Sequence, residues 1–154
     1  MRALLKSFVY AFRGILAALK TQRNMRIHFT AAVYVTAFSL FYDLTRTEYA
    51  LLALTFGAVI SCEMINTAVE AAVDISSPGY SEKAGFAKDA AAGAVLVAAI
   101  FAVVVGVLLF GDIAVIKEIF RYYGSHFLAL AGLICSFVAA WVFVFGAFKN
   151  RRDK

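Results

Sequence analysis

The chain has 154 residues, of which 63% are hydrophobic and 16% are charged, and its formal net charge is +5. Soluble domains are about 45–50% apolar and about 25% charged, so this composition excludes a soluble globule and, because apolar residues abound, a disordered chain. The length leaves room for three or four membrane spans of about 20 residues, and the basic residues flank apolar runs instead of forming a nucleic-acid-binding domain.

Residues 2–20 predict one amphipathic helix. At about 100° per residue, the large apolar side chains from Leu4 to Leu19 fall on one broad arc. A narrow basic stripe beside the arc consists of Arg2, Lys6, Arg13 and Lys20. This pattern is typical of a helix that lies in the membrane surface with its cations near anionic headgroups. Packing on partner helices in the cytoplasm is the alternative.

A polar segment at 21–28, interpreted as a hinge, separates this helix from four apolar stretches. The stretches lie at 29–42, 49–73, 90–110 and 127–148, and the joints between them lie at 43–48, 74–89 and 111–126. The first stretch is short, so its span is expected to begin inside the hinge or to be tilted. The joint 111–126 is expected to hold a short helix at the membrane surface. The fold class is therefore an all-α membrane protein with an N-terminal surface helix, three transmembrane helices and a fourth C-terminal one.

Basic residues predict the orientation of these spans. Six lie in the N-terminal segment at 1–28, two in the joint 74–89 and four in the C-terminal tail, against three in the other two joints. The positive-inside rule then places both termini and the joint 74–89 in the cytoplasm, where ATP is found. The chain divides into the surface helix and hinge at 1–28, a three-span core at 29–110, and a C-terminal segment at 111–154.

Four polar side chains interrupt the second apolar stretch, namely Glu63, Asn66, Glu70 and Asp74. On a helix they point to about 0°, −60°, −20° and +20°, so they form one narrow stripe. Each ionisable residue at the bilayer centre costs at least about 2.5 kcal/mol, so the stripe must face protein, a cation or water. A metal ion or a lysine is expected among the carboxylates, unless some stay protonated. Hydrogen bonding between helices is the alternative, although one asparagine would achieve it at lower cost.

Lys88 and Asp89 precede a run of small residues at 90–94, which lets another backbone approach closely. If the joint 74–89 is short, this pair returns to the level of Glu70 and Asp74. Phosphoryl transfer needs a base, a divalent ion and cations on the phosphates, whereas cation transport needs similar carboxylates. The spacing alone leaves a kinase and an ion-conducting or transporter protein open, although a fixed lysine favours the kinase. The sequence contains neither a GxxxxGK[ST] loop nor the protein-kinase motifs.

Three segments resemble one known family. The run EMINTAVEAAVD at 63–74 resembles the signature of the small bacterial integral-membrane lipid kinases, which comprise prokaryotic diacylglycerol kinases and undecaprenol kinases. The segment KDAAAGAV at 88–95 resembles the second block of that family. The segment RNMRIH at 23–28 resembles the hinge of the undecaprenol-kinase branch. The resemblance extends over about residues 5–110.

The resemblance implies a homotrimer of three-span protomers, each with an N-terminal surface helix, in the bacterial cytoplasmic membrane. It implies a lipid kinase, with Mg²⁺ as cofactor and ATP as co-substrate, that phosphorylates a membrane lipid alcohol such as undecaprenol or diacylglycerol. By position, Glu63 matches the catalytic base and Asn66 its polar neighbour. Glu70 matches a metal ligand that also approaches the nucleotide. The other positions that match nucleotide contacts are Tyr10, Gln22, Gly79, Tyr80, Ser81, Lys88 and Asp89.

Two features depart from the family pattern. Gln22 stands where the family usually has a glutamate, which is a second metal ligand. An amide oxygen still coordinates Mg²⁺ weakly, so either the second ion binds more loosely or activity is reduced or lost. A catalytically dead relative that serves as an assembly protein is therefore a third possibility. The fourth apolar stretch is absent from typical three-span members, and an outer packing helix is the expected role.

Overall fold

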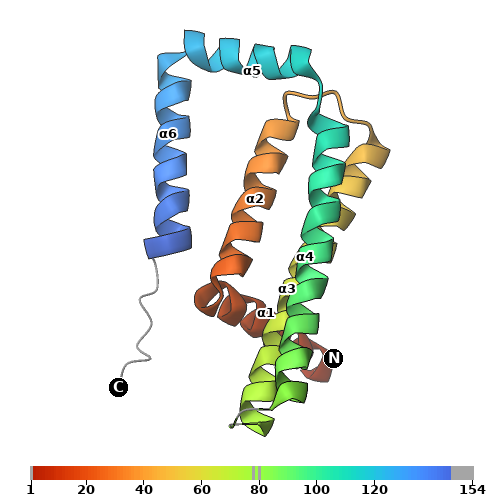
Figure 1. Ribbon diagram of the computed structural model, residues 1–154. Coiled ribbons are helices and arrows are strands. Elements are labelled where there is room, and N and C mark those ends of the chain that lie inside the picture. The colour runs from red at the N-terminus through yellow and green to blue at the C-terminus, as the bar shows by residue number, and fades with distance from the viewer. Residues whose placement is uncertain (1, 78, 80, 147–154) are drawn as a thin grey trace.

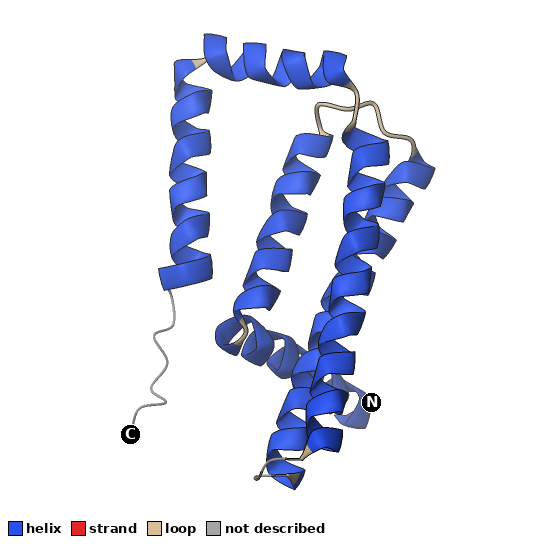
Figure 2. Cartoon of the chain, viewed as in Figure 1, coloured by secondary structure: helices blue, strands red, loops and turns tan. Residues whose placement is uncertain are grey.

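The computed structural model describes residues 2–77, 79 and 81–146, and the described chain is almost wholly helical (Figure 1; Figure 2). In chain order the helices are α1 (Arg2–Thr21), α2 (Arg23–Ser39), α3 (Arg46–Ser76), α4 (Glu82–Phe110), α5 (Ile113–Ser125) and α6 (Phe127–Trp141), and α6 continues into a π-helical turn, η1 (Val142–Gly146). The predicted all-α membrane fold is confirmed.

Three of these segments are long and apolar enough to cross a membrane: α3, α4, and α6 together with η1. The α3 and α4 helices, of 31 and 29 residues, form an antiparallel hairpin whose two arms lie side by side near the turn and diverge towards the start of α3 (Figure 1). The predicted joint 74–89 is mostly helical, because α3 continues to Ser76 and α4 begins at Glu82. The turn of the hairpin is therefore short, which brings Asp74 and Lys88 to a common level.

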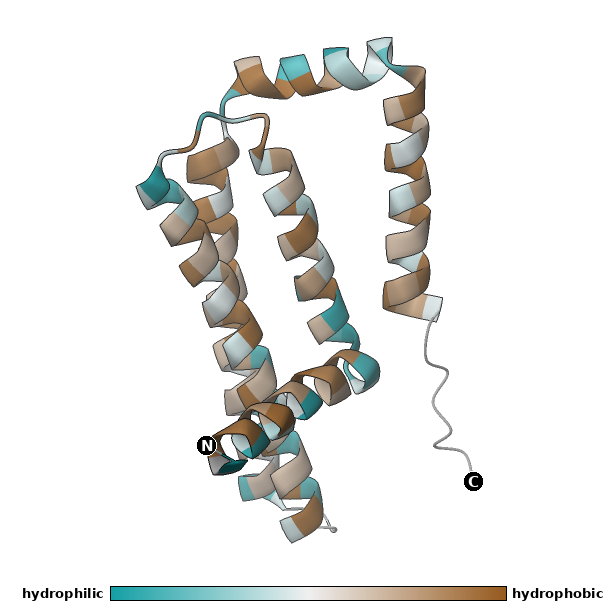
Figure 3. Ribbon diagram, turned by 180° about the vertical axis from the view of Figure 1, so that it is seen from behind, coloured by the Kyte–Doolittle hydropathy of each residue, from teal (hydrophilic) through white to brown (hydrophobic). Residues whose placement is uncertain are grey.

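The junction between α1 and α2 is a single residue. Gln22 has extended backbone angles, φ −101° and ψ 121°, and α2 resumes at Arg23. The hinge predicted at 21–28 is thus too long, since residues 23–28 are the first turns of α2. The helix of the first predicted span does begin inside this segment, but α2, with 17 residues, is not among the described helices that are long and apolar enough to cross a membrane. The helix α1, which precedes the junction, crosses the hairpin (Figure 3). It lies close to α3 at Gly14, where an added Cβ would be 3.9 Å from Cε of Met64.

The distribution of polarity is that of a membrane protein. Glu63 and Asn66 on α3 are 2% and 7% exposed, whereas Leu108 on α4 is 76% exposed. Most of the large hydrophobic side chains of the long helices are exposed, and Figure 3 shows hydrophobic residues along these helices and several hydrophilic ones near the turn of the α3–α4 hairpin. This arrangement is stable only where lipid replaces water around the bundle.

At the opposite end of the bundle α5 runs from the end of α4 to the start of α6 (Figure 1), and Tyr122 of α5 contacts Phe41 with 5.6 Å between ring centroids. Tyr42 donates a hydrogen bond to the Phe110 carbonyl oxygen at 3.0 Å, and burial together with the Asp112 carboxylate raises the pKa of Tyr42. Gly111 follows at the end of α4, where an added Cβ would lie 2.5 Å from the Val107 carbonyl oxygen. The surface helix predicted within 111–126 is confirmed as α5.

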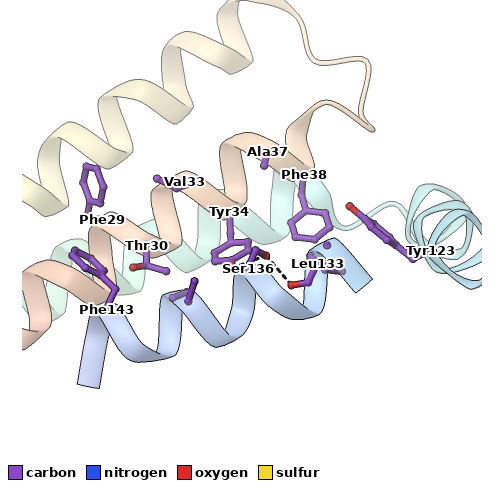
Figure 4. Close-up of a pocket in the computed structure, with 13 residues that line it drawn as sticks. Phe29, Thr30, Val33, Tyr34, Ala37, Phe38, Tyr123, Leu133, Ser136 and Phe143 are labelled. Carbon is purple, nitrogen blue, oxygen red and sulfur yellow. Dashed lines mark hydrogen bonds between the residues drawn. The ribbon is translucent and has the colours of Figure 1, made fainter. Parts of the chain in front are cut away.

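The predicted fourth span is α6 with η1, which covers Phe127–Gly146; residues 147 and 148 of the prediction lie outside the described residues. It stands beside α2, where Tyr34 donates to Ser136 Oγ at 3.0 Å and stacks on Phe137 with 4.8 Å between ring centroids. An open cavity of about 660 Å³ separates much of the two helices (Figure 4). The expected outer packing helix therefore packs on α2, and packs loosely along most of its length.

Candidate active site

Glu63 is the most deeply buried ionisable side chain among the described residues, at 2% exposed. It lies in the middle of α3, on the face that also carries Asn66 one turn later. Glu63 Oε2 and Asn66 Oδ1 are buried, and no described residue donates a hydrogen bond to either atom. A buried polar group without a partner costs free energy, so two such oxygens on one face indicate that the site binds a donor or a cation from outside the chain.

Both residues border a cavity of about 320 Å³ between α2, α3 and α4. Glu63 and Asn66 line it from α3, and Asn24 and His28 line it from the first turns of α2. The rest of the wall is small or aliphatic and comes mainly from α4, with Ala92, Val95, Leu96 and Ala99. The cavity is large enough for the head of a lipid alcohol but not for a whole lipid.

The polar stripe continues along α3 towards the turn of the hairpin. Asn66 Nδ2 donates a hydrogen bond to Glu70 Oε1 at 3.0 Å, which fixes the amide so that its oxygen remains free. Asp74 is exposed and forms an ion pair with Lys88 of α4. Two linked pairs therefore follow Glu63 along the hairpin, Asn66 with Glu70 and Asp74 with Lys88.

An apolar groove adjoins the polar cavity. It has a volume of about 350 Å³ and runs between α2, α3 and α4, and His28 and Ala99 line both spaces. Apart from His28 and Thr55 its lining is apolar, with residues such as Leu52, Val59 and Val103. A hydrocarbon chain in this groove would place a polar head group in the cavity beside Glu63.

The structure places the remaining predicted contacts at the turn of the hairpin, on α4 and on α1. Gly79 is in the turn of the hairpin, Ser81 Oγ caps α4 by accepting from the Ala84 amide at 3.4 Å, and Asp89 is exposed on α4. Tyr10 lies on α1, 64% exposed and with Arg13 above its ring at 6.0 Å. Tyr80 lies outside the described residues.

The oxygen atoms of the site fit the way in which nucleotide-dependent enzymes hold Mg²⁺. No group of three His, Cys, Asp or Glu side chains is close enough to hold a metal ion by itself within the described portion of the chain. Mg²⁺ in such enzymes is usually bound by one or two carboxylates together with substrate phosphates and waters. The half-buried Glu70 beside the free Asn66 amide oxygen fits that mode, whereas Gln22, at the α1–α2 junction, offers only an amide oxygen.

Asn24 and His28 are site residues that the sequence analysis did not assign. Both lie in the segment 23–28, whose family resemblance was recognised but interpreted as a hinge. On a helix, a spacing of four residues places two side chains on one face. A helical assignment of the segment 23–28 would therefore have predicted that Asn24 and His28 lie together. The pattern could not show that this face turns towards Glu63.

The model of the prokaryotic diacylglycerol kinase family matches residues 9–110. This match begins within α1 and ends with α4, so it contains every residue of the site described above. The helices α5 and α6 lie beyond it.

Individual relatives agree with the family match. The diacylglycerol kinase of Synechocystis is 51% identical over 105 residues, which are 67% of this chain and 59% of that protein. The undecaprenol kinase of Bacillus subtilis is 40% identical over 68% of this chain and 85% of its own length. The diacylglycerol kinase of Escherichia coli K12 is 30% identical over 69% of this chain and 87% of its own length. The chain therefore belongs to the prokaryotic diacylglycerol kinase family, a family of membrane lipid kinases.

Proposed function

We propose that the chain transfers the terminal phosphate of ATP to the hydroxyl of a membrane lipid alcohol, in a reaction that requires Mg²⁺. The observation that carries this proposal is the buried carboxylate of Glu63, which has an oxygen without a partner among the described residues and lines a cavity that adjoins an apolar groove. A hydrocarbon chain in the groove would bring its hydroxyl to this oxygen. Undecaprenol and diacylglycerol both have this chemistry, as the names of the relatives illustrate.

Glu63 acts as the general base in this proposal. As the lipid oxygen attacks the terminal phosphorus, the new O–P bond forms and the bond from phosphorus to the bridging oxygen of ADP breaks. The hydroxyl proton passes to the Glu63 carboxylate, and Asn66 is the polar neighbour of this base, linked through its amide nitrogen to Glu70. A positioned base of this kind contributes about 10²- to 10⁴-fold to a rate.

Glu70 is the proposed metal ligand, and Gln22 is a weaker second one. When bound, Mg²⁺ neutralises charge on the phosphate oxygens during transfer. The hydrogen bond from Asn66 fixes one oxygen of Glu70 and leaves the other to coordinate. Base and metal ligand are seven residues apart on one face of α3, or about 10 Å along its axis, a separation that a phosphate chain can bridge.

The nucleotide is proposed to contact the exposed end of the hairpin and α1. Lys88 would exchange Asp74 for a phosphate oxygen, and Asp89 would contact the nucleotide beside it. The remaining proposed contacts are Tyr10 from α1, Gly79 and Ser81 from the turn of the hairpin, and Tyr80, which lies outside the described residues. Both termini and this turn are proposed to be cytoplasmic, and the working unit is proposed to be a homotrimer.

The experiment that tests the proposed function is a panel of lipid alcohols. Purified full-length chain in mixed lipid micelles is expected to transfer label from γ-labelled ATP to undecaprenol or diacylglycerol, and to stop when a chelator removes Mg²⁺. An acyl chain without a hydroxyl, supplied as a methyl ester, is the control acceptor. Absence of transfer to every alcohol in the panel would contradict the proposal, and absence of Mg·ATP binding by calorimetry would favour a non-catalytic relative.

Restoring a carboxylate at the α1–α2 junction provides a separate prediction. The change Gln22→Glu is expected to lower the Mg²⁺ concentration for half-maximal activity about tenfold, because a carboxylate binds Mg²⁺ more tightly than an amide. The measurement is the initial rate of phosphate transfer against Mg²⁺ at saturating ATP. The matched variant Gln22→Ala should not show this gain. An unchanged half-maximal concentration in Gln22→Glu would exclude position 22 from the metal site.

A further inference from the structure

The C-terminal helix α6 reaches back to the α1–α2 junction through one buried arginine. Arg26 lies in the first turn of α2 and is 7% exposed. Its Nε donates to the carbonyl oxygen of Val144 in η1 at 3.2 Å. Its Nη1 donates to the carbonyl oxygens of Leu19 and Lys20, at the end of α1, at 3.2 and 3.1 Å. One guanidinium therefore joins α1, α2 and η1.

The partners of Arg26 explain why the guanidinium is held there. The last four carbonyl groups of a helix have no partner within it, and the C-terminal end carries a partial negative charge. Leu19 and Lys20 provide such carbonyls from α1, and the π-helical turn at the end of α6 directs the carbonyl of the buried Val144 to the same place. Arginine suits this position because its planar fork donates in several directions at once.

Arg26 is placed between two residues of the active-site cavity. Asn24 precedes it by two positions and His28 follows by two, and both line the cavity with Glu63. Arg26 itself is not among the lining residues, because its side chain leaves α2 towards Leu19 and Val144. The contacts of Arg26 thus set how the first turns of α2 are oriented without touching the reacting groups.

The Arg26 contact lies at the closely packed end of the interface that α2 forms with α6 and η1. Further along, α2 and α6 are separated by the cavity of about 660 Å³, whose walls include Phe29, Val33 and Phe143 (Figure 4). Val144 at the η1 end is 6% exposed, whereas Phe127 and Leu128 at the other end of α6 are 79% and 84% exposed. Since the family match ends at residue 110, the core site does not account for α6.

We propose that α6 braces the α1–α2 junction through Arg26, and that this brace positions Asn24 and His28 opposite Glu63. Arg26 is a positioning residue, and α6 is a working part of the enzyme and not only an outer covering. The expected effect on kcat rests on the proposed kinase function. The expected effect on structure, which is that α1 keeps a fixed position relative to α3, does not depend on that function.

The test uses the full chain with two readouts. Spin labels at Ala11→Cys on α1 and Ile65→Cys on α3, in a Cys62→Ala, Cys135→Ala background diluted with unlabelled protein, report the α1–α3 distance.

Arg26→Gln is expected to broaden or shift this distance and to lower kcat about 10- to 100-fold, with the KM for ATP nearly unchanged, because a small misplacement in a site has an effect of that size. Arg26→Lys, which keeps the charge without the fork, should recover part of both. The matched control is Arg23→Gln, an exposed arginine in the same turn, which should change neither.

A second variant approaches the contact from the other side. Val144→Trp adds bulk at a buried position of η1 and should displace its carbonyl from Arg26. If both changes act through one contact, the double variant will be no worse than the more severe single variant. Additive losses, or Arg26→Gln and Val144→Trp chains with the wild-type distance or the wild-type kcat, would overturn the brace. A wild-type chain without kinase activity would count against the proposed function, while the distances would still decide whether the brace exists.

Discussion

Replacing Glu63 with glutamine is expected to lower kcat for phosphate transfer by about 10³-fold, which corresponds to about 4 kcal/mol of lost transition-state stabilisation. Glutamine has the shape of glutamate but cannot accept the hydroxyl proton. ATP binding should be largely unchanged, because Glu63 lies in the cavity away from the exposed end of the hairpin. The measurements are the transfer of label from ATP to the lipid alcohol and the calorimetric Kd for Mg·ATP.

The matched control is Glu118→Gln, which removes an exposed carboxylate from α5 at the opposite end of the bundle and should leave kcat unchanged. The Glu63→Gln chain should insert and purify normally, since the change replaces a buried acid by a neutral group of the same size. An enzyme that keeps more than about a tenth of its kcat after Glu63→Gln would remove Glu63 from the role of base.

Replacing Glu70 with glutamine is expected to lower kcat/KM for ATP by about 100-fold, equivalent to about 2.7 kcal/mol, and to raise the Mg²⁺ concentration for half-maximal activity. The amide keeps an oxygen that can accept the hydrogen bond from Asn66, so the local packing should survive while the negative charge is lost. The measurement is a Mg²⁺ titration of the initial rate at fixed ATP.

For this second prediction the control is Glu82→Gln, an exposed carboxylate in the first turn of α4 close to the turn of the hairpin. It changes the net charge by the same amount without touching the stripe on α3. If Glu70→Gln and Glu82→Gln have the same Mg²⁺ dependence as the wild-type chain, Glu70 does not bind the metal.

The portion of the site that lies on one helix could be predicted from the sequence. Glu63, Asn66 and Glu70 share a face because of the helical period alone, and the cost of carboxylates in lipid predicts that this face is sheltered. The return of Lys88 to the level of Glu70 and Asp74 followed from a short joint, and the ion pair of Lys88 with Asp74 is what the structure adds. These predictions needed no knowledge of how separate helices are placed.

The portion that depends on contacts between distant helices could not be predicted. Arg26 and Val144 are 118 residues apart, and an arginine near a hinge looks like one more cation at the membrane surface. Asn24 and His28 were recognised only as members of a segment, since periodicity gives the direction of a side chain relative to its own helix but not the neighbour that it meets. The single-residue junction at Gln22 was missed because polar residues resemble a loop even where the backbone is helical.

The lengths of α3 and α4 have a consequence for where the two halves of the reaction occur. Helices of 31 and 29 residues are about 45 Å long, whereas the hydrocarbon layer is about 30 Å thick, so roughly a third of an upright hairpin extends beyond the hydrocarbon into the headgroup region and the water. The end that carries Lys88 projects beyond α1 (Figure 1). A phosphate donor in the aqueous phase and a lipid acceptor in the bilayer can thus meet on the same two helices. Neither of them has to leave its own solvent.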